Sequence, residues 1–209
     1  MKSSTFPLAT RPISFNQGQE FADWIVDLFN GLQIESTYMV GNSFGGFLTL
    51  NTALFLPERV KKIVLISPAA TFIPIPAWSW HFMPANIIGS VIGSKRILLS
   101  AYNWIWQDFP KDENIAQLRA ITAIYGRPRH WFPPVLTDEE LRKIRTPVLL
   151  LIGDHEVIYK PERAIERATR LVIGLKAEIL PNANHIAEYT AADVTNKKVL
   201  EFFADQRVE

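Results

Sequence analysis

"TYMVGNSFGGFL", residues 37–48, places a serine between glycines where a strand-like run gives way to a helix-like run. The pattern is Gly-x-Ser-x-Gly, with Ser43 at its centre. A strand–turn–helix frame around that pattern is what a nucleophile elbow requires, because the sharp turn strains the backbone and exposes the serine hydroxyl. The flanking glycines, Gly41 and Gly45, are expected to let the strand and the helix approach without a Cβ clash. A passive serine in a glycine-rich turn is the alternative interpretation.

Outward from this stretch, short aliphatic runs alternate with helical patterns. Residues 61–67 and 146–153 are near-continuous aliphatic runs, which are typical of parallel strands covered on both faces. Residues 176–180 predict one more strand. Because strands alternate with helices, the sequence predicts an α/β fold with a parallel sheet. The predicted helices span residues 19–32, Ser43 to about Pro57, a segment led by Pro161, and residues 191–203.

One long interval, residues 68–146, separates two consecutive predicted strands, where a crossover needs only about a dozen residues. We expect it to hold a mainly helical cap, and we divide the chain into core residues 1–67, cap residues 68–140 and core residues 141–209. Thr137 and Glu140 have capping-box spacing and predict a helix start. Most aromatic residues of the interval should pack the cap onto the core, and a few should line an apolar pocket above Ser43. They are Phe72, Trp78, Trp80, Phe82, Tyr102, Trp104, Trp106, Phe109, Tyr125, Trp131 and Phe132.

Composition narrows the class of protein without naming a function. The 209 residues suffice for one sizeable core, and the 22 basic and 21 acidic residues nearly cancel, so nothing indicates a nucleic-acid partner. The chain has no cysteine, which excludes disulfides, cysteine–zinc sites and thiol catalysis. No run resembles a signal peptide or a membrane-spanning helix, and the default expectation is a cytoplasmic protein.

A nucleophilic Ser43 needs a base, and the chain has four histidines. His81 and His130 fall in the predicted cap, a poor place to hold a rigid base, and His155 stands beside acidic residues. His185 follows the last predicted strand, at the sheet edge where the Ser43 turn emerges. His185 is therefore the preferred base, with a structural surface histidine as the alternative.

The carboxylate that orients the base should also follow a strand. After residues 146–153 the chain offers Asp154 and Glu156, either of which could instead be a solvated loop charge. The order serine, acid, histidine is that of α/β-hydrolases, not of chymotrypsin-type or subtilisin-type enzymes.

Four segments together resemble the α/β-hydrolase superfamily over nearly the whole chain. They are GNSFGG (41–46), PERVKKIVLISPA (57–69), TPVLLLIGDHEVIY (146–159) and PNANHIAEY with VLEFF (181–189 and 199–203). The resemblance implies that Ser43 is the nucleophile and His185 the base, with no metal or organic cofactor. It favours Glu156 as the acid over Asp154, because the family's acid stands three residues after a glycine, here Gly153.

The resemblance begins late in the family's fold. Residues 1–25 resemble only the loop and helix after its fourth strand, so the earlier strands and the His-Gly loop that supplies one oxyanion-hole N–H are not in this sequence. The backbone N–H of Phe44 would supply the other donor, and we expect weak turnover. Met1 would then be an internal methionine or the start of a shortened form.

The absent strands also predict an exposed sheet edge at residues 37–40, and a helix 19–32 whose Trp24 and Phe29 face is partly uncovered. An apolar edge is a template for pairing, so we expect a homo-oligomer through this edge or poor solubility.

Three functions remain open. The first is a serine hydrolase that cleaves a small or medium apolar ester-like substrate through Ser43, His185 and Glu156. Within that class, GNSFGG also resembles the elbow of carbon–carbon bond hydrolases that act on ring-cleavage products. The second is a shortened form that binds without efficient turnover, and the third is a scaffold in which the triad is a relic.

Overall fold

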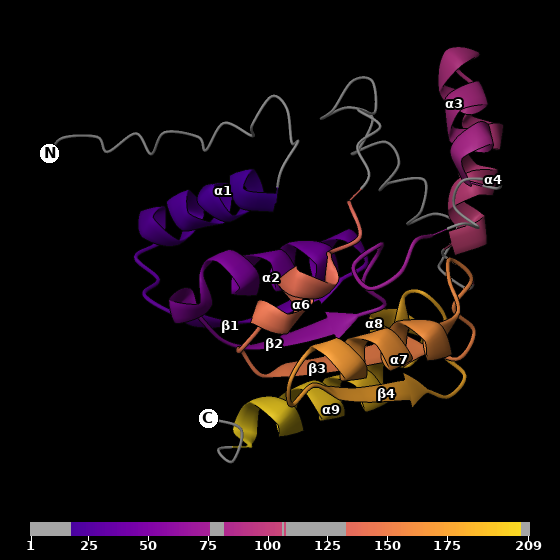
Figure 1. Cartoon of the computed structure of the whole chain (residues 1–209). Coiled ribbons are helices and arrows are strands. Elements are labelled where there is room, and N and C mark those ends of the chain that lie inside the picture. The colour runs from indigo at the N-terminus through magenta and orange to yellow at the C-terminus, as the bar shows by residue number, and fades with distance from the viewer. Residues whose placement is uncertain (1–17, 76–81, 106, 108–132, 206–209) are drawn as a thin grey trace, which may run out of the picture.

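The computed structural model describes residues 18–75, 82–105, 107 and 133–205. Within them the chain forms a four-stranded parallel sheet in the order β1-β2-β3-β4, with helices on both faces (Figure 1). The predicted α/β fold with a parallel sheet is confirmed. The strands are β1 Thr37–Asn42, β2 Val60–Ile66, β3 Val148–Gly153 and β4 Lys176–Leu180.

The helices begin where the sequence signals predict. Pro161 occupies the first turn of α7, where its missing N–H costs no hydrogen bond. Thr137 caps α6 through a complete capping box, in which Glu140 N donates to Thr137 Oγ1 at 3.2 Å and Thr137 N donates to Glu140 Oε2 at 2.7 Å. The helices are α1 Gly18–Gly31, α2 Phe44–Phe55, a 3₁₀ turn Pro57–Arg59, α3 Met83–Val91, α4 Lys95–Ile105, α6 Asp138–Lys143, α7 Pro161–Leu171, α8 Ala187–Thr190 and α9 Ala192–Ala204.

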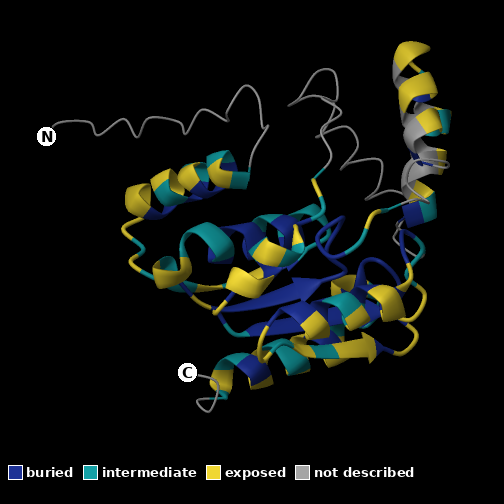
Figure 2. Cartoon of the chain, in the orientation of Figure 1, coloured by how far each residue is buried: buried dark blue, intermediate teal, exposed yellow. Residues whose placement is uncertain are grey.

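Alternate residues of the central strands face two separate apolar layers. On β2, Ile63 and Leu65 join a core with α1, α2, α6 and α7, whereas Val64 and Ile66 join a core with α8 and α9. Figure 2 shows β2 and β3 as buried strands between these helices. Because both faces are covered, β3 and residues 63–66 of β2 are continuous aliphatic runs, as the sequence indicated. The sheet is therefore a rigid base for residues at the carboxyl ends of its strands.

The long connection between β2 and β3 contains α3 and α4, which lie beyond the carboxyl ends of the strands (Figure 1). Its two ends are tied together at the core, since Leu136 N donates to Thr71 O at 3.2 Å. Arg167 of α7 reinforces this junction by donating to the carbonyls of Phe72 and Leu136 and to the carboxylate of Asp138. The insertion therefore leaves and re-enters the core at one place.

The aromatic residues of the insertion can be followed only in part. Phe72 and Phe82 are buried in the larger core, and Trp104 packs against it, as expected for a cap that contacts the body. The pocket expected above Ser43 and the boundaries at residues 67 and 140 stay predictions. Trp78, Trp80, Trp106, Phe109, Tyr125, Trp131, Phe132 and the side chain of Tyr102 lie outside the described residues.

Strand β1 pairs only with β2 in the part of the chain that the structure describes, and Tyr38 and Val40 are exposed on it. The expectation that Phe29 would be uncovered is wrong. Phe29 follows Phe21 and Ile25 at helical spacing along the buried face of α1, and the guanidinium of Arg59 lies 5.7 Å from the centre of its ring. The exposed large apolar residues of this region are instead Leu28 of α1 and Leu32, the residue after its end.

A search of the described helices finds none that is both long and apolar enough to span a bilayer.

Candidate active site

Ser43 stands at the turn between β1 and α2 in a strained conformation, with φ 50° and ψ −116°. An ordinary serine N-cap has extended backbone angles and accepts a hydrogen bond from the first turn of its helix. Ser43 has neither feature. Its φ is positive, and its side chain makes no capping hydrogen bond. The usual structural reason for a serine at a helix start is therefore missing here.

Four backbone hydrogen bonds hold this turn. Ser43 N donates to Ile66 O at 3.0 Å, and Ser43 O accepts from Gly46 N at 3.0 Å, Phe47 N at 3.2 Å and Ala69 N at 2.9 Å. A backbone conformation that costs about 1–3 kcal/mol persists only when its surroundings fix it. The neighbouring strand and the following helix supply that fixation, so the position of Ser43 is set by the sheet.

The glycines around Ser43 have different functions. A Cβ on Gly41 would lie 2.2 Å from Gly45 O, so only glycine allows the strand and the helix to meet there, as predicted. The same interpretation of Gly45 is wrong, because a Cβ on it would meet no described atom within 4 Å. The second close approach belongs to Gly46, whose Cβ would lie 2.8 Å from Pro68 Cβ.

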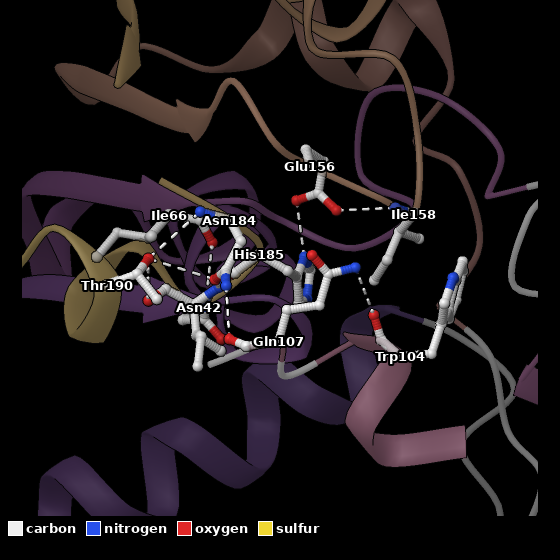
Figure 3. Close-up of polar contacts among 10 residues, drawn as sticks. Asn42, Ile66, Trp104, Gln107, Glu156, Ile158, Asn184, His185 and Thr190 are labelled. Atoms are coloured by element: carbon white, nitrogen blue, oxygen red, sulfur yellow. Dashed lines mark hydrogen bonds and ion pairs between the residues drawn. The ribbon is translucent and has the colours of Figure 1, made fainter. Parts of the chain in front are cut away.

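Glu156 and His185 form a buried pair at the carboxyl edge of the sheet. Glu156 Oε2 lies 2.7 Å from His185 Nδ1, and the two side chains are 0% and 1% exposed (Figure 3). The alternative of a surface histidine is therefore wrong for His185. A carboxylate in this position accepts the Nδ1 proton and leaves Nε2 as the basic nitrogen.

The second oxygen of Glu156 is also occupied. Ile158 N donates to Glu156 Oε1 at 2.9 Å, which fixes the orientation of the carboxylate toward His185. Burial of the Tyr159 phenol, and after it the negative charge of Glu156, raises the pKa of that phenol well above its ordinary value of 10.0. Tyr159 therefore stays neutral beside Glu156 at neutral pH.

Asp154, the alternative acid, has a different set of contacts. Its Oδ1 accepts from Ala183 N at 3.1 Å, and 37% of its side chain is exposed. Desolvation of the carboxylate works to raise the pKa of Asp154, but hydrogen bonds from the backbone of Asn182 and Ala183 outweigh it and lower that pKa. Asp154 thus braces the start of the loop that carries His185.

The remaining histidines do not join the pair in the part of the chain that the structure describes. His155 is largely exposed, with its Nδ1 3.8 Å from Asp154 Oδ1. His81 and His130 lie outside the described residues.

Asn42, the residue before Ser43, links the elbow to the histidine loop. Its Nδ2 donates to His185 O at 2.9 Å and lies 3.4 Å from Ile66 O (Figure 3). His185 Nε2 is buried and has no hydrogen-bond partner among the described residues, Ser43 included. Catalytic hydrogen bonds are often long before substrate binds. The structure thus joins Glu156 to His185 directly and brings Ser43 to the same edge through Asn42.

Sequence reasoning missed Asn42, Tyr159 and Asn184 as residues of this region. Asn184 precedes His185, is buried and contacts both the histidine loop and the insertion (Figure 3). The available signal was a pair of asparagines beside the two predicted catalytic residues. Polar side chains at buried strand ends need partners, which makes such asparagines candidates for holding the loops.

No group of three or more His, Cys, Asp or Glu side chains in the described residues could hold a metal ion.

Comparison with known proteins identifies the family of the chain. Residues 6–197 match the model of the alpha/beta hydrolase family. The chain is 35% identical over 192 residues to the uncharacterized carboxylesterase nap of Bacillus subtilis, covering 88% of this chain and 62% of that protein. It is 29% identical over 194 residues to a 2-hydroxymuconate semialdehyde hydrolase of Pseudomonas putida, covering 85% of this chain and 63% of that protein.

Among solved structures, naproxen esterase (carboxylesterase NP) from Bacillus subtilis superimposes with a TM-score of 0.76 at 34% identity, covering 93% of this chain and 70% of that one. The chain thus spans less than two thirds of the length of the two curated relatives above. The matched segment includes the elbow, the acid strand and the histidine loop. The chain belongs to the alpha/beta hydrolase family.

Proposed function

We propose that this chain is a serine hydrolase that cleaves small or medium apolar carboxylic esters through an acyl-enzyme. The observation that carries the proposal is the buried 2.7 Å contact between Glu156 and His185, which leaves His185 Nε2 without a partner at the edge where Ser43 emerges. The similarity to a protein named as a carboxylesterase and to the naproxen esterase supports an ester as the substrate class.

In this mechanism Ser43 Oγ attacks the ester carbonyl carbon while His185 Nε2 takes its proton. The imidazolium then gives that proton to the departing alcohol, and an acyl group stays on Ser43. Water, deprotonated by the same Nε2, attacks the acyl carbon. The bond from that carbon to Ser43 Oγ then breaks, Oγ takes the proton back from Nε2, and the carboxylic acid leaves. Glu156 keeps the proton on Nδ1 throughout and stabilises the imidazolium by its charge.

The backbone N–H of Phe44 is the proposed donor to the oxyanion. Phe44 is the first residue of α2, and the N–H groups of the first turn of a helix point out of its N-terminal end, where they can donate to an anion. The positive end of the helix dipole lies at the same place and favours negative charge on the carbonyl oxygen.

The direct test is Ser43→Ala, with a fluorophosphonate probe and p-nitrophenyl esters. Alanine fits the same turn, so the circular dichroism spectrum should be unchanged while labelling and ester turnover are lost. A variant that still labels at the wild-type rate would remove Ser43 from the mechanism. Labelling of the wild type without turnover would instead favour the impaired binding form, and absence of both would favour a scaffold.

A second candidate reaction is hydrolysis of a carbon–carbon bond, favoured by the similarity to the 2-hydroxymuconate semialdehyde hydrolase. A vinylogous diketone assayed beside a p-nitrophenyl ester separates the two. An ester preference supports the leading proposal, and a kcat/KM that is higher for the diketone contradicts it.

A further inference from the structure

Asn184 uses both ends of its side-chain amide inside the protein. Its Oδ1 accepts from Ile186 N at 3.0 Å and from Thr190 Oγ1 at 3.3 Å, which shapes the loop on either side of His185. Its Nδ2 donates to Gln107 O at 2.6 Å, although Gln107 belongs to the insertion. The residue is 4% exposed, so these bonds form away from bulk water.

Gln107 in turn holds the end of an insertion helix. It lies two residues beyond α4, and its Nε2 donates to Trp104 O in the last turn of that helix at 3.3 Å (Figure 3). Trp104 packs against the larger core. Through Gln107, the end of α4 is therefore fastened to the residue beside His185.

We propose that Asn184 is a positioning residue that joins the end of α4 to the loop of His185, and that this end of α4 forms one wall of the ester-binding site. This inference rests on the proposed serine hydrolase function. The amide oxygen shapes the loop, and the amide nitrogen holds the wall. One side chain therefore fixes the position of the loop relative to the wall. Bulky apolar esters, which reach the wall, depend on the nitrogen. Small esters, which do not reach it, depend on the loop alone.

Two substitutions of Asn184 remove the nitrogen and keep an oxygen. Asn184→Asp is the closest in shape, and at pH 8 it places a second oxygen against Gln107 O. Asn184→Ser is neutral, and its hydroxyl can still accept from Ile186 N in a turn of the same kind. The matched control is Thr190→Val, which removes the hydroxyl that donates to Asn184 Oδ1 and accepts from Asn184 N but leaves both partners of the Nδ2 contact in place.

The experiment combines hydrogen exchange of the peptide covering residues 95–107 with kinetics on a p-nitrophenyl acetate and a bulky aryl-acyl p-nitrophenyl ester. Loss of one buried hydrogen bond should speed exchange in that peptide about tenfold in both Asn184 variants. KM for the bulky ester should rise about tenfold, while KM for the acetate changes less than about twofold. Thr190→Val should leave the exchange unchanged and lower kcat for both esters.

An unchanged exchange rate of this peptide in both Asn184 variants would overturn the inference. An equally large increase of the exchange rate in Thr190→Val would also overturn it, because it would mean that any substitution in the loop loosens α4. Equal effects on the two esters would also overturn it. Exchange does not require activity, so a wild-type protein that neither labels nor hydrolyses esters would refute the proposed function while the exchange data still decide on the Asn184 contact.

Discussion

Replacing Glu156 by glutamine should reduce ester turnover far more than the loss of one charge at the surface would. Ile158 N donates to Glu156 Oε1, so the oxygen of the new amide must stay there to accept it. The amide nitrogen then faces His185 Nδ1 and donates to it. That contact selects the tautomer with its proton on Nε2, which cannot accept a proton from Ser43.

The size of the effect follows from the geometry of the pair. Glu156 and His185 are both buried, and their nearest charged atoms lie 2.7 Å apart. With about 4 Å between the centres of the two delocalised charges, the attraction in the reacting state is about 4 kcal/mol at an effective dielectric constant of about 20. That energy equals a factor of about 10³ in kcat. The unfavourable tautomer of His185 adds to this loss, so we expect kcat to fall by a factor of about 10³–10⁴.

The assay is p-nitrophenyl ester hydrolysis together with the rate of fluorophosphonate labelling, and Asp154→Asn is the matched control. Asparagine can still accept from Ala183 N through its oxygen, so this control should lose less than about tenfold. Glu156→Gln within about tenfold of the wild type would refute the tautomer reasoning, and a larger loss in Asp154→Asn would transfer the role of the acid to Asp154.

Three further predictions concern stability and assembly. Ser43→Gly should stabilise the fold by about 1 kcal/mol while abolishing activity, because glycine tolerates φ 50°; equal urea midpoints for the glycine and alanine variants would contradict this. Arg167→Met should cost about 2 kcal/mol by depriving two carbonyls of their donor. The hydrogen bond from Arg167 holds the pKa of Asp138 below its usual 3.8, so this pair stabilises the wild type above that pH and the benefit disappears as the pH falls through the lowered pKa. Unfolding free energies of Arg167→Met should depend less on acid pH than those of the wild type, because only Arg142 and Arg170 then lower the pKa of Asp138; an identical dependence would refute this. The exposed edge of β1 should produce a homo-oligomer that Val40→Lys dissociates, and a monomeric wild type by light scattering at several concentrations would sink that expectation.

The fold could be predicted in detail because its signals are local. The aliphatic runs, the capping box at Thr137 and the proline that begins α7 each depend on a few neighbouring residues. The mistake over Gly45 has a geometric cause. The second close approach is to Pro68, on the strand connection beside the elbow, and spacing within the motif does not reveal which glycine faces it.

The candidate site could be predicted only in its outline. Strand order placed Ser43, Glu156 and His185 at one edge, but the choice between Asp154 and Glu156 needed a resemblance. The contact of Asn184 with Gln107 joins residues 77 positions apart, one of them in the insertion, and no periodicity connects them. Such a contact depends on how two separately folded segments meet.

The junction where Thr71 and Leu136 bond has a consequence for the history of this chain. Because the insertion departs and returns at adjacent points, its length can change without moving β2 or β3. Exchange of the whole insertion would disturb the contacts of Arg167 and Asn184 and the apolar packing of Phe72, Phe82 and Trp104 on the larger core. The insertion can therefore vary in length while the strands and the strained turn at Ser43 keep their positions.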